Sequence, residues 1–254
     1  MVPNFFFGEL FLFPFRYIVS DFSTEVEFSF NMEFKVEERE MESPIDIEKK
    51  QWIALVIYFG SYIMSDLLDS IYDFSHLTLV TFSFIHFSLL LFLIIYLLKK
   101  DLSITVFNKE QASTRKSLLI IFMSLFIIVI GLIIISILRS LLLSTPNENP
   151  TVNILKSFPI MIIPMVLMGP IIEEIIFRRI LLVSFTKKYN LLVAVVIVSI
   201  IFAVWHQSLS SFPNYFFLSV VYSYSYYLSN RLMVPVILHV LWNLIASSIQ
   251  IFVM

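Results

Sequence analysis

Hydrophobic residues dominate the chain from residue 51 onward, in runs of about twenty that short polar or charged stretches separate. A helical run of this length crosses the hydrocarbon core of a bilayer. The pattern predicts an all-α fold, a polytopic membrane helix bundle of about seven transmembrane helices. Their expected positions are 52–72, 77–98, 117–143, 158–185, 191–209, 213–229 and 232–253.

The first 50 residues follow a different pattern. Charged residues interrupt the Phe-rich start of the chain, and residues 33–50 are highly charged and mostly acidic. We therefore expect residues 1–50 to form an extramembrane tail and residues 51–254 to form the transmembrane domain. Met32 and Met41 stay open as alternative starts of translation.

The composition supports a membrane protein. Hydrophobic residues make up 59% of the chain and charged residues 14%, whereas soluble domains carry about 25% charged residues. A net charge of −2 gives no basic surface for nucleic acid, so the lipid bilayer is the expected surrounding partner. The chain has no cysteine, which excludes disulfides, thiol catalysis and thiolate metal sites.

Basic residues gather in alternate loops, and the positive-inside rule makes those loops cytoplasmic. Lys49 and Lys50 place the N-terminus on the same side, so seven spans put the C-terminus outside. The other basic residues of these loops are Lys99, Lys100, Lys109, Arg115, Lys116, Arg178, Arg179, Lys187, Lys188 and Arg231.

This topology predicts that a cysteine introduced at Asn108 reacts with a thiol reagent only after the cell membrane is opened. The chain suits the experiment because it has no cysteine of its own. Labelling of that cysteine from outside intact cells would reverse the predicted orientation.

Two adjacent acids lie deep in the fourth predicted span, where an ionisable group costs about 2.5–3.5 kcal/mol and indicates function. Arg178 follows Glu174 by four residues, so the two can pair on one helix face. Glu173 is rotated by about 100° from Glu174 and should point elsewhere, free for chemistry. A buried ion pair that only joins helices is the structural alternative.

His206 lies in the fifth predicted span, and the hairpin between this span and the fourth turns near Tyr189 and Asn190. Glu173 and His206 are nearly equidistant from that turn, so regular helices would place them at one depth. A carboxylate and an imidazole together can activate a water molecule. A lone histidine bonded to a backbone carbonyl is the alternative.

His239 and Asn243 share one face of the seventh predicted span because they are four residues apart. Their N–H groups could stabilise an oxyanion in a dry site. Interhelical hydrogen bonds without catalysis are the alternative. His86 is expected to be a satisfied packing residue, and Arg139 to reach the membrane interface.

Taken together, three motifs resemble those of the CAAX-processing and bacteriocin-immunity family of intramembrane proteases, also called the CPBP or Abi family. They are E-E-x-x-x-R at Glu173, Glu174 and Arg178, F-x-x-x-H at Phe202 and His206, and H-x-x-x-N at His239 and Asn243. Order, spacing and placement on three predicted helices agree over residues 158–250, the family's catalytic core. Arg179 departs from the family, because many members have Gly there.

The resemblance implies a glutamate-dependent endopeptidase with its active site in an intramembrane cavity. Glu173 would be the catalytic base, His206 would help to hold the water, and His239 and Asn243 would stabilise the oxyanion. Glu174 and Arg178 would support the site, and no cofactor is expected. The substrate would be a peptide or protein, and bacterial relatives are linked to bacteriocin self-immunity and peptide maturation.

Three alternatives stay open. A zinc ion could bind His206, His239 and Glu173, although the chain has no Cys ligand and no His-x-x-x-His pair. The chain could act without catalysis, as a membrane scaffold or immunity protein. A small proton-coupled transporter would use the two acids as relay groups. The composition favours a bacterial source, hence a plasma membrane location with the N-terminus in the cytoplasm.

Overall fold

The computed structural model describes residues 48–71, 75–100, 102, 106–107, 109–142 and 158–253. Nearly all of the predicted tail, with both alternative start positions, lies outside the described residues. The described part of the chain is helical and contains no strand. The predicted all-α fold is therefore confirmed.

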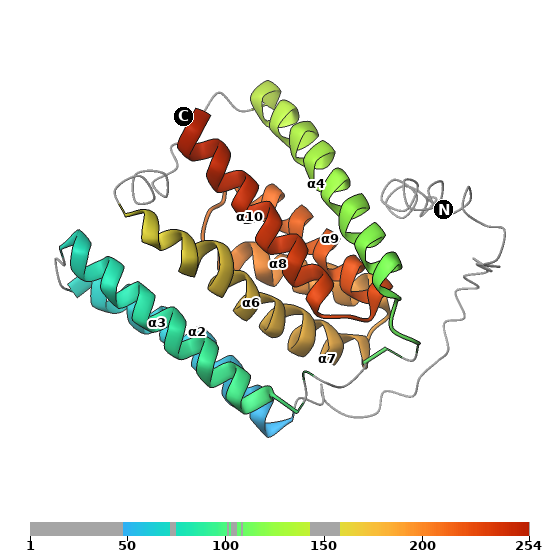
Figure 1. Cartoon of the computed structure of the whole chain (residues 1–254), viewed down its shortest axis with the longest axis horizontal. Coiled ribbons are helices and arrows are strands. Elements are labelled where there is room, and N and C mark those ends of the chain that lie inside the picture. Colours follow the sequence, from blue (N-terminus) through green and yellow to red (C-terminus); the bar gives the residue numbers. More distant parts are fainter. Residues whose placement is uncertain are drawn as a thin grey trace, which may run out of the picture. The chain divides into compact units, whose positions relative to one another are not determined.

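Seven helical segments follow one another close to the predicted positions (Figure 1). The first three are α2 (Lys49–Ile71), α3 (His76–Leu98) and α4 (Thr114–Leu142), and the last three are α8 (Leu191–Trp205), α9 (Phe212–Ser229) and α10 (Met233–Val253). Between them runs a composite helix made of η2 (Pro159–Met161), η3 (Ile163–Met168), α6 (Gly169–Glu173), η4 (Glu174–Leu182) and α7 (Val183–Thr186).

Three of these helices are long and apolar enough to cross a membrane: Leu77–Leu98, Thr114–Leu141 and Pro159–Thr186. Leu191–Trp205 and Met233–Ile249 are apolar but shorter. Among the described residues, length and composition thus single out fewer spans than the seven predicted, and in α9 Ser and Tyr residues lower the mean hydropathy. The described helices form the helix bundle of an integral membrane protein.

The composite helix lies at the centre of the described bundle. It contacts α2 and α3 on one side and α8, α9 and α10 on the other, while α4 packs against α9 and α10. Figure 1 shows it running between the α2–α3 pair and α10. Its neighbours bury every residue of η4, including Glu174 and Arg178. The two predicted acids therefore stand where several helices meet.

The composite helix is not the regular helix that we predict for residues 158–185. Both η3 and η4 are π-helical. The Gly169 N–H donates to the Pro164 carbonyl, five residues earlier. In that pattern the next carbonyl, at Met165, faces Pro170, which has no N–H to donate. The π-helical turn therefore frees the Met165 carbonyl for a partner from another helix.

Candidate active site

Glu174 is the centre of a buried polar network that joins two elements. Its Oε1 lies 3.1 Å from Arg178 Nη1, and His239 Nδ1 lies 2.8 Å from the same oxygen. Glu174 and Arg178 are fully buried. The pairing predicted from their four-residue spacing is observed. The hydrogen bond from α10 was not predicted, and it ties His239 to η4.

Arg178 is held from α9 and α8 as well. Its Nη2 donates to Ser219 Oγ at 3.0 Å and to the Ser219 carbonyl at 3.3 Å. The guanidinium lies 4.7 Å from the ring centroid of Phe202 and 5.2 Å from that of Tyr222. These contacts, together with the ion pair to Glu174, keep both charged groups in one arrangement.

Glu173 has a different environment from its neighbour. Its side chain is 16% exposed, and its Oε2 lies 3.9 Å from His239 Nε2, too far for a hydrogen bond. Among the described residues this oxygen has no hydrogen-bond partner. Glu174 Oε2 also has no partner among the described residues, so the two acids differ in two other ways: Glu174 is fully buried and bound through Oε1, whereas the Glu173 side chain is 16% exposed and lies outside that ion pair.

We predict a helix that reaches residue 209. In the structure, His206 instead lies just beyond the end of α8. The helix ends at Trp205, and Gln207 has a left-handed φ of 50°. The His206 Nδ1 lies 2.7 Å from the Phe202 carbonyl, which can only accept. Neutral His206 therefore carries its proton on Nδ1 and leaves Nε2 as an acceptor.

The structure brings His206 near the other predicted site residues without a direct hydrogen bond to them. Phe202, whose carbonyl binds His206, has its ring centroid 6.1 Å from that of His239, and the His206 ring stacks on Tyr215 with centroids 3.9 Å apart. The carbonyl bond of the non-catalytic alternative is present as well. That bond uses Nδ1 alone, so Nε2 of His206 keeps its lone pair for another donor.

His239 lies between the two carboxylates. Oε1 of Glu174 is the acceptor for Arg178, which can only donate, so the Nδ1 of His239 also donates to this oxygen. The other ring nitrogen faces Glu173. Tyr222 stacks on the imidazole, with centroids 4.6 Å apart. The Nδ1 atom and one face of the His239 ring are thereby held in place, and its Nε2 points toward the carboxylate of Glu173.

Asn243 is the partner of the freed Met165 carbonyl. Its Nδ2 donates to this oxygen at 3.3 Å, which joins α10 to η3. An amide nitrogen carries two N–H donors, so one remains for another acceptor. His239 and Asn243 lie on one side of α10, and each contacts a different segment of the composite helix.

The arrangement of metal-ligating side chains bears on the zinc alternative. Within the described ranges, no group of three or more His, Asp or Glu side chains is placed to hold a metal ion. Nδ1 of His239 is bound to Glu174, so Nε2, which faces Glu173, is the ring nitrogen that a zinc ion would use.

Several residues around the site were not predicted as part of it. Tyr215, Ser219 and Tyr222 come from α9, whose Ser and Tyr residues gave the only sequence signal. Tyr58 and Tyr62 of α2 both pack against Trp205, the residue before His206, although α2 carries none of the three motifs. Two helices therefore contribute aromatic side chains that the motifs do not reveal.

The remaining predicted residues lie away from this network. His86 packs against Tyr62 and Phe87, but its Nε2 is buried without a hydrogen-bond partner among the described residues, so it is not satisfied as expected. Arg139 donates to the Ser210 carbonyl at 3.3 Å. Arg179 is buried and interacts with Tyr226.

Residues 155–245 match the family described as type II CAAX prenyl endopeptidase Rce1-like. The membrane-embedded CAAX protease MroQ of Staphylococcus aureus (strain USA300) is 34% identical over 105 residues, which are 39% of this chain and 42% of MroQ. The candidate membrane peptidase YdiL of Bacillus subtilis (strain 168) is 30% identical over 105 residues, 41% of this chain and 43% of YdiL.

The similarity thus spans less than half the length of these relatives. No solved structure matches the chain significantly. The segment 155–245 contains all three motifs, so the predicted resemblance to the CAAX protease family is confirmed over the region that carries the candidate active site.

Proposed function

Because residues 155–245 match the Rce1-like CAAX protease family, we propose that the chain is a membrane endopeptidase that uses Glu173 to activate a water molecule. The observation that carries the proposal is the contrast between the two adjacent acids. Glu174 is fully buried and bound through Oε1 to Arg178 and His239, whereas Glu173 is 16% exposed and lies beside His239 without a hydrogen bond to it.

In the proposed reaction, Glu173 takes a proton from water as the oxygen attacks the peptide carbonyl. The acceptor Nε2 of His206 helps to orient the same water, since Nδ1 is engaged with the Phe202 carbonyl. Glu173 then gives the proton to the leaving amine. One partly exposed carboxylate acts first as base and then as acid.

The oxyanion is stabilised by donors from α10. Asn243 has an N–H left after its bond to Met165. His239 gives its Nδ1 proton to Glu174, so it can donate from Nε2 only as an imidazolium. Such fixed donors stabilise developing charge strongly in a water-poor site.

The proposed substrate is a peptide or a protein segment at the membrane, and the proposed location is a bacterial plasma membrane with the N-terminus in the cytoplasm. Both relatives above come from bacteria. Substrate trapping tests the activity: the Glu173→Gln variant should retain peptides that the native chain releases cleaved. Mass spectrometry of the bound peptides identifies them, and native chain that cleaves none of them contradicts the proposal.

The proposed mechanism predicts that catalysis needs no metal ion. Purified protein treated with a strong chelator should keep its activity, because Glu173 itself supplies the base. Elemental analysis should find far less than one metal ion per chain. Stoichiometric zinc, with activity that is lost on chelation and restored by added zinc, would replace this mechanism by the metal alternative.

A further inference from the structure

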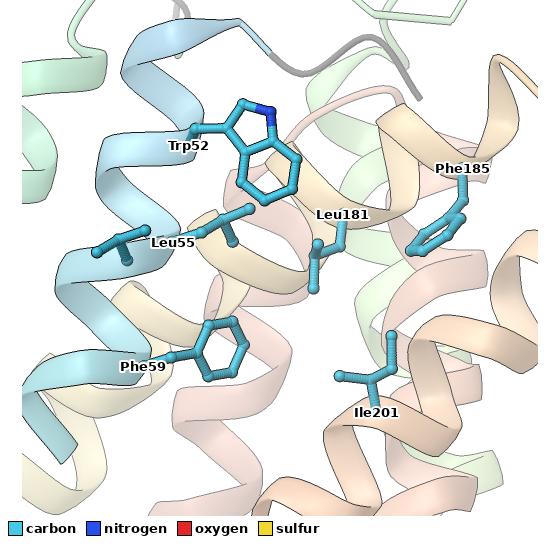
Figure 2. A pocket seen from close by; sticks show the side chains of 7 residues that line it. Trp52, Leu55, Phe59, Leu181, Phe185 and Ile201 are labelled. Carbon is cyan, nitrogen blue, oxygen red and sulfur yellow. The ribbon is translucent and has the colours of Figure 1, made fainter. Parts of the chain in front are cut away.

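An apolar groove lies between the start of α2, the end of the composite helix and α8. Its volume is about 370 Å³, within the range of about 300–1,000 Å³ that ligand pockets occupy. Figure 2 shows the side chains around it: Trp52, Leu55, Phe59, Leu181, Phe185 and Ile201.

The α2 wall of the groove faces outward from the bundle. Trp52 is 52% exposed and Val56, which also lines the groove, is 67% exposed. Leu55 and Leu181 form the buried floor. In an integral membrane protein, an outward-facing apolar surface of this kind contacts lipid. A groove lined only by apolar side chains suits a hydrocarbon chain.

Basic residues stand at the end of the groove where α2 begins and α7 ends. Lys49 precedes Trp52, Val56 and Phe59 by three, seven and ten residues, so it lies on the same face of α2. On the other wall, Lys188 follows Phe185 by three residues in the turn after α7. Both lysines are exposed, as are the adjacent Lys50 and Lys187, and Glu48 is the acidic residue beside them.

We propose that this groove binds an anionic phospholipid, with one acyl chain in the apolar groove and the phosphate beside Lys49 and Lys188. Apolar volume and positive charge are complementary to the two parts of such a lipid. Trp52 stands between them, at the level where Trp side chains commonly meet the membrane interface. A helix from another protein would match the apolar lining but not the lysines.

The groove also has a wall in common with the candidate active site. Phe59 contacts Trp205 with ring centroids 4.6 Å apart, and Trp205 immediately precedes His206. Ile201 likewise precedes Phe202, whose carbonyl accepts from His206. An acyl chain in the groove therefore packs against the segment of α8 that positions His206. Binding of the lipid does not depend on proteolysis and is measured separately from it.

Quenching of Trp52 fluorescence by brominated lipids tests the proposal. The full chain is placed in vesicles of phosphatidylcholine and phosphatidylglycerol in equal amounts, with bromine on the acyl chains of one lipid or the other. The chain has three Trp residues, so subtracting the emission of a Trp52→Phe variant isolates the signal of Trp52. Brominated phosphatidylglycerol should quench Trp52 several-fold more strongly than brominated phosphatidylcholine does. Each lysine at the headgroup should favour binding of the anionic lipid by roughly fivefold.

Two matched pairs of variants separate the headgroup from the groove. Lys49→Gln with Lys188→Gln should remove the preference for phosphatidylglycerol, whereas Arg115→Gln at the start of α4 should keep it. Val56→Phe should fill the groove and weaken quenching by the anionic lipid, whereas Ile133→Phe, on an exposed face of α4, should not.

Equal quenching of Trp52 by the two lipids in the native chain would overturn the proposal. The proposal would also be overturned if the preference for phosphatidylglycerol survived the double lysine replacement, or if Arg115→Gln abolished it too. In either case the anionic lipid would be attracted by the charge of the protein surface in general and not by Lys49 and Lys188. Absence of quenching by both lipids would mean that a protein segment covers the groove. Unchanged quenching in Val56→Phe would place the lipid elsewhere.

Discussion

Replacing Glu173 by glutamine is expected to lower turnover by about a hundred- to ten-thousandfold, the contribution of a positioned general base. The amide has nearly the shape of the carboxylate but cannot take a proton from water. Folding should be almost unaffected, because Oε2 of Glu173 has no hydrogen-bond partner among the described residues and lies 3.9 Å from His239. Turnover of a trapped peptide and thermal unfolding in detergent measure the two effects.

Glu174→Gln is the matched comparison, since it makes the same chemical change one residue along the chain. A Glu173→Gln variant that keeps more than a tenth of the native turnover would exclude Glu173 as the base. The variant should still bind the peptide, which distinguishes lost chemistry from a lost site. If both variants had equal stability and equal loss of turnover, the division of roles between the two acids would be wrong.

The helices could be predicted from the sequence because their apolar runs are long and polar breaks separate them. The predicted turn near Tyr189 and Asn190 is observed, with the Asn190 side chain accepting from the Val193 N–H at the start of α8. The Glu174–Arg178 pair could be predicted because it lies within four residues of a single helical segment. Contacts of this kind depend on local geometry alone.

The details of the site could not be predicted for a physical reason. The bond between His239 and Glu174 joins residues 65 positions apart and depends on how α10 packs against the composite helix. The segment between Glu173 and the turn near Tyr189 is π-helical over Glu174–Leu182, so it lacks the regular helical rise that the depth estimate assumes. The sequence spacing placed His239 and Asn243 on one helix face but identified no partner for His239 Nδ1, which the structure places 2.8 Å from Glu174 Oε1.

Replacing Glu174 by glutamine is expected to lower the free energy of unfolding by about 3–5 kcal/mol, the range measured when one partner of a buried ion pair is removed. Arg178 is fully buried, and Glu174 is the carboxylate that lies 3.1 Å from its guanidinium. The variant leaves this charge without compensation and weakens the hold on His239. Unfolding in detergent, followed by circular dichroism, measures the loss.

A double-mutant cycle shows whether the loss comes from the charge. Arg178→Met alone should also be destabilising, because it leaves the buried Glu174 without its guanidinium partner. Combining Arg178→Met with Glu174→Gln removes both charges, so the double variant should be more stable than the sum of the single losses predicts. The methionine would still pack against Phe202 and Tyr222, which line the guanidinium now. Additive losses would mean that packing and the bonds to Ser219 hold this region, and that the ion pair adds little to the stability of the fold.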